Sequence, residues 1–248
     1  MQIDDHLATL RMEGTALGNA AERAGPDAPI PTCPEWTTRD LVRHIGEVHR
    51  WAAAHVRDRR TTPADPSKEP DLIGPWPSDA SLIEWYREGH EALLGVLAEA
   101  EPSVECWSFL PAPSPLAFWA RRQCHETAIH RADADSALGR VAAVESQVGA
   151  DGIDELVVGF LGRPRRRDVP EPVTLQLIAP DVDRSWTVVL GPDGVQVGPE
   201  LAPDGPAITV KGPASDLDLL LWNRRSSAGL EVEGDPTVLD TWSRTVRI

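Results

Sequence analysis

The segment SPLAFWARRQCHETAIHRADAD, residues 114–135, decides the architecture of the first half of the chain. Ser114 can cap a helix, and Pro115 suits the first helical turn, where the missing backbone N–H costs nothing. A helix is therefore expected to begin here and to continue to about Leu138.

Polar residues recur on one stripe of this predicted helix. Glu126 and His130 are four residues apart and lie within about 40° of one another around the axis. Trp119 and Asp133, each seven residues from Glu126, share the stripe. An acid and an imidazole on an inward stripe are costly unless something pairs with them, and a metal ion is one such partner.

Three further helices are expected from apolar residues at alternating steps of three and four. They cover residues 3–24, about 38–52 and 82–100. Thr37 and Asp40 form a capping-box pattern at the start of the second of these helices. Helices of similar length with a Pro-rich crossover over residues 61–77 predict a four-helix bundle.

The second half of the chain changes character. After an expected fifth helix over residues 151–161 and a basic linker, Arg163 to Arg167, strand-like runs are separated by turn signals. These runs are VTLQLI, SWTVVL, GVQV, AITV and LEVEG, with helices expected over residues 217–222 and 236–242. The fold class is therefore α+β, with domains expected at residues 1–162 and 168–248.

A third ligand for a metal is available on the second predicted helix. His44 lies between apolar positions of that helix and is the best inward candidate, and His49 is the runner-up. His44, Glu126 and His130 form a two-histidine, one-carboxylate set, the usual form of a catalytic zinc site with one position open. From spacing alone the alternatives remain a surface Glu–His pair and a core histidine with ordinary hydrogen bonds.

Composition excludes several classes of protein. The net charge of −15 argues against a nucleic-acid binder that neutralises phosphates. No apolar run is long enough for a membrane span, and the acidic N-terminus is unlike a signal peptide, so a cytoplasmic protein is expected. Three cysteines, Cys33, Cys106 and Cys124, are an odd number without CxxC spacing, which argues against a disulfide framework or a cysteine-rich zinc knuckle.

Two segments resemble one known family. CPEWTTRDLVRHIGEVHRW (residues 33–51) and HETAIHRADAD (residues 125–135) are similar to the mycothiol-dependent maleylpyruvate isomerase family of actinobacteria, and GPASDLDLLLWNRR with LEVEGD resembles its second domain. The resemblance implies a DinB-like metal-binding bundle followed by a small α+β domain of sterol-carrier-like topology. It also carries the metal ligands onto His44, Glu126 and His130.

The resemblance further implies a divalent metal, most simply zinc, and mycothiol as thiol co-substrate. A metal-activated thiolate could isomerise a cis double bond or, as an S-transferase, displace a leaving group from a small electrophile; a non-catalytic metal-binding module is the third alternative. Arg224 and Arg225 are candidates for an anion clamp, although a solvated pair at a helix C-terminus is the competing interpretation. We expect a monomer that binds neither nucleic acid nor membrane.

Overall fold

The protein is described by a computed structural model that covers residues 1–64, 71, 73–163, 168–169, 171–198 and 205–246. The chain divides into two compact units, Met1–Ala142 and Ala143–Ile248. Among the described helices, none is both long and apolar enough to cross a membrane.

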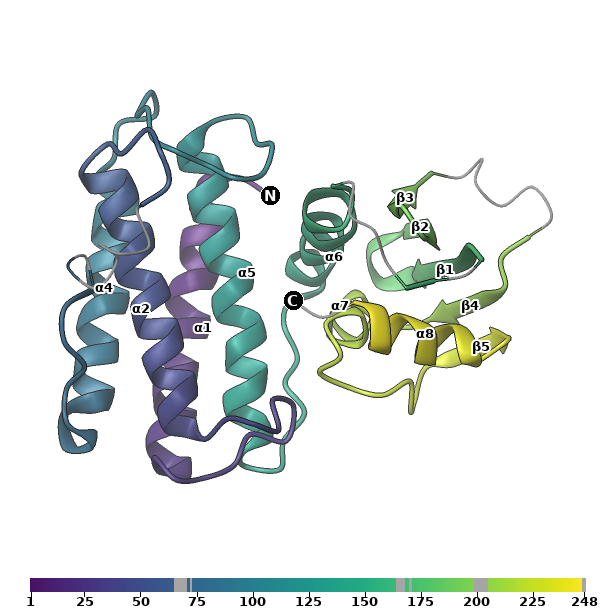
Figure 1. Cartoon of the computed structure of the whole chain (residues 1–248), viewed down its shortest axis with the longest axis horizontal. Helices are drawn as coiled ribbons and strands as arrows, with labels where there is room; N and C mark the ends of the chain where they lie inside the picture. Colours follow the sequence, from purple (N-terminus) through teal and green to yellow (C-terminus); the bar gives the residue numbers. More distant parts are fainter. Residues whose placement is uncertain (65–70, 72, 164–167, 170, 199–204, 247–248) are drawn as a thin grey trace. The chain divides into compact units, whose positions relative to one another are not determined.

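Four long helices build the first unit, as the sequence predicts. They are α1 (Ile3–Ala24), α2 (Thr38–Arg57), α4 (Leu82–Glu99) and α5 (Pro115–Ser136). Figure 1 shows them side by side, with α5 next to both α1 and α2. The short 3-10 turn η1 (Asp79–Ser81) precedes α4. Part of the predicted 61–77 crossover lies outside the described residues.

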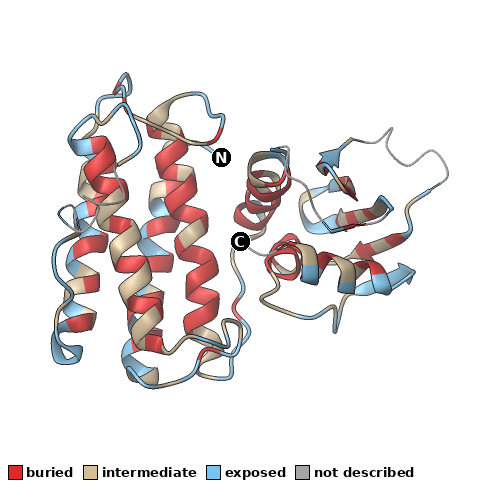
Figure 2. Ribbon diagram, in the orientation of Figure 1, coloured by how far each residue is buried: buried red, intermediate tan, exposed pale blue. Residues whose placement is uncertain are grey.

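The bundle core follows the predicted apolar stripes. Buried faces run along the helices where they meet one another (Figure 2). The members of one core cluster share near-complete burial; they are Leu17, Ala20, Ala21, Ile30, Leu41, Val42, Ile45, Leu82, Tyr86 and Ala134. Burial of this apolar surface is the main force that holds the helices together.

A five-stranded sheet forms the centre of the second unit. Its strands are β1 (Val173–Ala179), β2 (Arg184–Gly191), β3 (Gly194–Val197), β4 (Ile208–Lys211) and β5 (Glu231–Gly234), in the order β3-β2-β1-β4-β5. Only the β1–β4 pair is parallel, with Leu175 opposite Ile208; the other neighbours are antiparallel. All five strand predictions are confirmed.

Helices α7 (Ala214–Leu221) and α8 (Thr237–Thr245) pack against β1, and the turn η3 (Pro180–Val182) joins β1 to β2. The fifth helix differs from its prediction. It forms as α6 (Ser146–Asp154), which starts five residues early and continues as a π-helical stretch, η2 (Glu155–Phe160).

The division between the units also differs from the expected domain limits of 1–162 and 168–248. It falls at Ala142 and Ala143, because α6 packs against α7 and so belongs with the sheet. Of the predicted basic linker, Arg163 is described, whereas residues 164–167 lie outside the described part of the chain.

Candidate metal centre

Three donor atoms from two helices meet in the first unit. On α5, Glu126 Oε1 lies 3.4 Å from His130 Nε2, and across the interface it lies 3.6 Å from His44 Nε2 on α2. All three atoms lie within 4.8 Å of one another. The structure thus brings together the three residues that the sequence singles out.

The spacing of these atoms fits a small divalent cation. Ligands about 2.1 Å from zinc at tetrahedral angles lie about 3.4 Å apart, close to both measured separations. Two imidazole nitrogens and one carboxylate oxygen are also a donor set that zinc accepts. His44 leaves 37 % of its side chain exposed and Glu126 leaves 23 %, so one side of the group remains open to an exogenous ligand.

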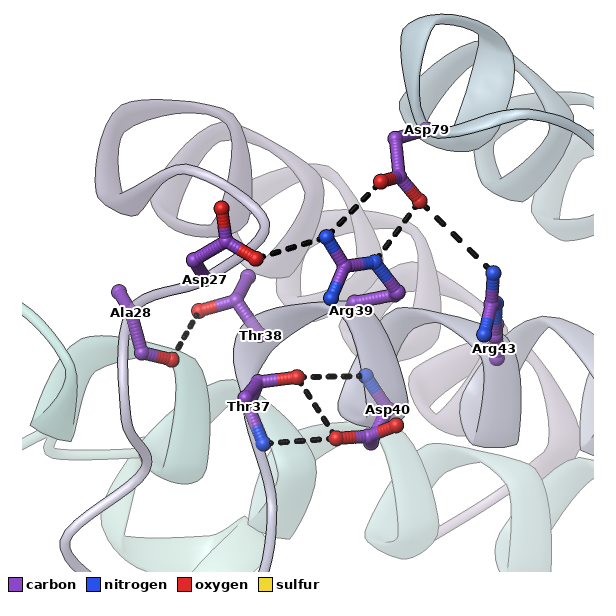
Figure 3. A network of polar contacts seen from close by, with 8 residues as sticks. All are labelled: Asp27, Ala28, Thr37, Thr38, Arg39, Asp40, Arg43 and Asp79. Carbon is purple, nitrogen blue, oxygen red and sulfur yellow. Dashed lines mark hydrogen bonds and ion pairs between the residues drawn. The ribbon is translucent and has the colours of Figure 1, made fainter.

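The start of α2 holds His44 in place. Thr37 caps the helix: its Oγ1 accepts from the Asp40 backbone N–H, and the Asp40 carboxylate accepts from the Thr37 N–H at 2.9 Å. Arg39 donates two hydrogen bonds of 2.8 Å to Asp79 of η1 (Figure 3). Because His44 follows the cap by only two helical turns, this anchored end fixes its position.

Burial corrects one step of the sequence argument. His49, the runner-up, is fully buried, whereas His44 sits at the edge of the apolar face. The Nε2 atom of His49 lies 2.9 Å from Thr127 Oγ1 on α5, and His49 is not part of the three-residue group. His44 reaches Glu126 because it is less inward than His49: it stands where α2 and α5 border solvent.

Asp133 orients the imidazole of His130. Its Oδ2 lies 2.8 Å from His130 Nδ1, and its Oδ1 accepts a 2.6 Å hydrogen bond from Thr32 Oγ1. A carboxylate on one imidazole nitrogen fixes the ring and leaves the other nitrogen for a metal, as in most histidine metal sites. The sequence argument places Asp133 on this stripe but does not predict the partner from the 25–37 loop.

Charges around the group perturb its titration in the metal-free protein. Burial lowers the pKa of His130, but hydrogen bonds to Asp133 and Glu126 outweigh it and raise the pKa to about 9. Burial would raise the pKa of Glu126, yet Arg122, His130 and His44 hold it well below its usual range. Arg122 Nη2 donates to Glu126 Oε2 at 2.6 Å, which leaves Oε1 turned toward the histidines.

Trp36 is a site residue that the sequence argument did not assign. Its ring stacks on His130, with centroids 5.9 Å apart and planes 19° apart, and it lies 5.0 Å from the His44 ring. Two signals could have pointed to it: its place just before the Thr37 cap, and its place in the segment 33–51 that resembles the family. The indole therefore forms one wall of the candidate metal centre.

Arg224 and Arg225 follow α7 in the second unit. Arg225 forms an ion pair with Asp216 and donates to the backbone carbonyls of Ser226 and Ala228. Arg224 Nη1 donates to the Trp222 carbonyl at 2.8 Å. Both guanidinium groups thus contact their own unit, and a clamp on a substrate anion stays a prediction.

Comparisons with known proteins decide the family. Residues 7–135 match the mycothiol maleylpyruvate isomerase N-terminal domain. The chain belongs to the mycothiol maleylpyruvate isomerase family. Residues 147–241 match the C-terminal domain described for the same family, and this match begins within α6, in agreement with the observed division of the chain.

Two solved structures from proteins of this description share the fold of the chain. The crystal structure of a mycothiol-dependent maleylpyruvate isomerase and that of a histidine-to-alanine mutant each give a TM-score of 0.65 at 14 % identity. Each match covers 94 % of this chain and 93 % of the other. A comparison with curated protein sequences found no match.

Proposed function

We propose that this member of the family is a metal-dependent enzyme that uses mycothiol to isomerise a cis-unsaturated substrate of the maleylpyruvate type. The observation that carries the proposal is the spacing of Glu126 Oε1, His44 Nε2 and His130 Nε2, which suits three ligands of one tetrahedral cation with an open fourth position. Family membership supports mycothiol as the thiol.

The ligand residues would act as a neutral pair of imidazoles and one carboxylate. His130 must lose its proton before it can coordinate, and Asp133 then keeps its Nε2 directed at the site. Arg122 holds the second oxygen of Glu126, so that this carboxylate presents one oxygen to the cation. A divalent ion such as zinc, when bound here, supplies the positive charge that lowers the pKa of a thiol at the open position.

The isomerisation itself needs only reversible addition. The thiolate sulfur adds to one carbon of the cis double bond, and the electron pair moves toward the conjugated carbonyl group. The new single bond rotates, and expulsion of the thiolate restores the double bond in the trans form. No net oxidation occurs, and the thiol is regenerated.

S-transfer to an electrophile is the second candidate, favoured by the contacts of Arg225. A maleylpyruvate-type substrate is an anion and would require a cation such as Arg225 or Arg224 to exchange its present partners for a carboxylate. A neutral electrophile with a leaving group would need no such exchange. In both cases we expect a monomer acting in the cytoplasm on a small molecule.

The experiment measures metal content and thiol-dependent turnover together. Elemental analysis of protein purified without added metal should give about one divalent ion per chain, and maleylpyruvate should be isomerised only when mycothiol is present. Glu126→Gln should lose most of both. Glu99→Gln, at the exposed end of α4, is the matched control.

Two outcomes would reject parts of the proposal. Wild-type metal content in Glu126→Gln would remove the metal assignment. Metal-loaded protein that forms a thioether from mycothiol and an alkylating electrophile, but leaves maleylpyruvate unchanged, would establish the transferase instead.

A further inference from the structure

Arg122 lies on the same stripe of α5 as two residues of the candidate metal centre. Arg122, Glu126 and His130 follow one another at steps of four residues, so their side chains lie one above the other on a single face. The Arg122 side chain is almost wholly buried, with 3 % of its surface exposed, and it forms an ion pair with Glu126. By charge alone a guanidinium beside a metal ligand weakens the site, because it repels the cation that the ligand binds.

The two oxygens of the Glu126 carboxylate have different partners. Oε2 accepts a hydrogen bond of 2.6 Å from Arg122 Nη2. Oε1 lies 3.4 Å from His130 Nε2 and 3.6 Å from His44 Nε2. The carboxylate is therefore turned so that one oxygen faces the candidate metal centre and the other faces the guanidinium.

Turning the second oxygen of Glu126 toward a cation would be costly. A carboxylate can bind a divalent cation through one oxygen or through both. The two-oxygen form would require Glu126 Oε2 to leave Arg122, and a hydrogen bond between two charged groups is one of the stronger kinds. Little water can replace this bond because Arg122 is buried, and a buried charge that loses a partner is strongly destabilising.

The number of donor atoms decides whether a thiol can bind. Two histidine nitrogens and one carboxylate oxygen are three donors, so a tetrahedral cation such as zinc keeps a fourth position for the thiol. If both oxygens of Glu126 were bound, the protein would supply four donors. The thiol sulfur would then have to displace a carboxylate oxygen or enter as a fifth ligand.

We propose that Arg122 is a positioning residue that limits Glu126 to one metal-binding oxygen and so reserves the fourth position of the cation for the thiol. This inference rests on the proposed function, which places a metal ion and a thiol at this centre. It gives Arg122 opposite effects on two binding steps. The guanidinium weakens the binding of the metal and strengthens the binding of the thiol.

Cobalt(II) in place of zinc makes both binding steps visible in the full chain. Its visible absorption is strong with four ligands and weak with six, and a thiol sulfur adds a charge-transfer band in the near ultraviolet. The cobalt-loaded wild type should show the strong absorption of a four-coordinate ion. Mycothiol should then add the sulfur band without a loss of visible intensity.

Arg122→Met keeps much of the length of the side chain but removes its charge and its N–H groups. Cobalt should bind to this variant at least as tightly as to wild type, because a repulsion is lost and a second oxygen becomes available. The visible absorption should weaken, and mycothiol should bind about ten-fold more weakly, a typical effect of removing a group that orients a metal ligand. Arg122→Lys, which keeps the charge and can donate to Oε2, should restore most of the thiol affinity.

Arg131→Met is the matched control. Arg131 is a second buried arginine of α5, and its partners are Asp135, four residues on at 2.9 Å, and Glu13 of α1. Its replacement removes buried ion pairs that contain no residue of the metal centre. Stability in urea should therefore fall, whereas the cobalt spectrum and the affinity for mycothiol should match those of wild type.

The outcomes separate this inference from the proposed function. The weak absorption of a six-coordinate cobalt ion in wild type would overturn the inference without any variant. So would an Arg122→Met protein with wild-type affinity for mycothiol, or one whose metal and thiol affinities fall together, as a purely structural role predicts. If wild type binds no cobalt, or shows no sulfur band with mycothiol, the proposed function fails and this inference fails with it.

Discussion

Replacing Asp133 with Asn should weaken metal binding strongly at high pH but much less near pH 7. The carboxylate of Asp133 has two effects on His130: it raises the affinity of the imidazole for a proton, and it orients the ring for a metal. The amide of Asn keeps the shape but not the charge. The two effects therefore separate in the pH profile of metal binding.

A proton and the metal compete for the His130 imidazole, and this competition determines how steeply the metal affinity depends on pH. With a pKa of about 9 for His130 in the metal-free protein, about 1 % of the chains have a neutral imidazole at pH 7. Apparent affinity should then rise about ten-fold for each pH unit from pH 6.5 to about 9, and level off above that, because one proton is released on binding. In Asp133→Asn the pH at which the affinity levels off should move down toward the ordinary histidine pKa.

The loss of the carboxylate that orients the His130 ring determines how far the metal affinity falls at high pH. Removal of such a carboxylate partner typically costs about 10- to 100-fold in metal affinity. Above pH 9 the Asp133→Asn protein should therefore bind zinc about 10- to 100-fold more weakly than wild type. Near pH 7 weaker proton competition offsets this loss, and the two affinities should approach each other.

A competition titration with a chromophoric zinc chelator, repeated from pH 6 to pH 10, measures the profile. Asp135→Asn is the matched control: Asp135 is on the same helix but bonds Arg131, not His130. If the zinc affinities of wild type and Asp133→Asn change with pH in parallel and level off at the same pH, the role assigned to Asp133 is refuted.

Three other results are expected. His44→Ala should lose most bound metal and His49→Ala should keep it, as elemental analysis would reveal. Metal lost from His49→Ala but kept by His44→Ala would mean that His49, not His44, is the ligand. Metal-free protein should lose up to about 3 kcal/mol of stability in urea between pH 6.5 and 9, since the folded pKa of His130 is raised; unchanged stability would contradict that pKa. A chain ending at Ala142 should stay helical by circular dichroism and bind metal but lose turnover; full activity would exclude a role for the second unit.

Local signals sufficed for the bundle and for much of the candidate site. The caps at Thr37 and Ser114 mark helix starts because their side chains satisfy backbone N–H groups that have no other partner. The four-residue step from Glu126 to His130 brings both to one face in any α-helix. His44 was placed by its apolar neighbours, although the structure puts it at the edge of that face.

Tertiary packing determined what local signals missed. Helix α6 contains Gly149 and Gly152, which have low helix propensity. A side chain on Gly149 would put its Cβ 2.6 Å from the Ser215 backbone nitrogen, and one on Gly152 would meet Asp218 at 2.7 Å. These glycines allow α6 to approach α7, and nothing in their immediate sequence reveals that contact.

The metal affinity depends on the conformational entropy that the 25–37 loop loses when it becomes ordered. This loop supplies Thr32 to Asp133 and Trp36 to the face of His130, so a bound metal and an ordered loop stabilise one another by reciprocal linkage. Pro31 and Pro34 restrict the unbound loop and so reduce the freedom that is lost when it orders. Residues that touch no ligand atom thus help to set how tightly the ion is held.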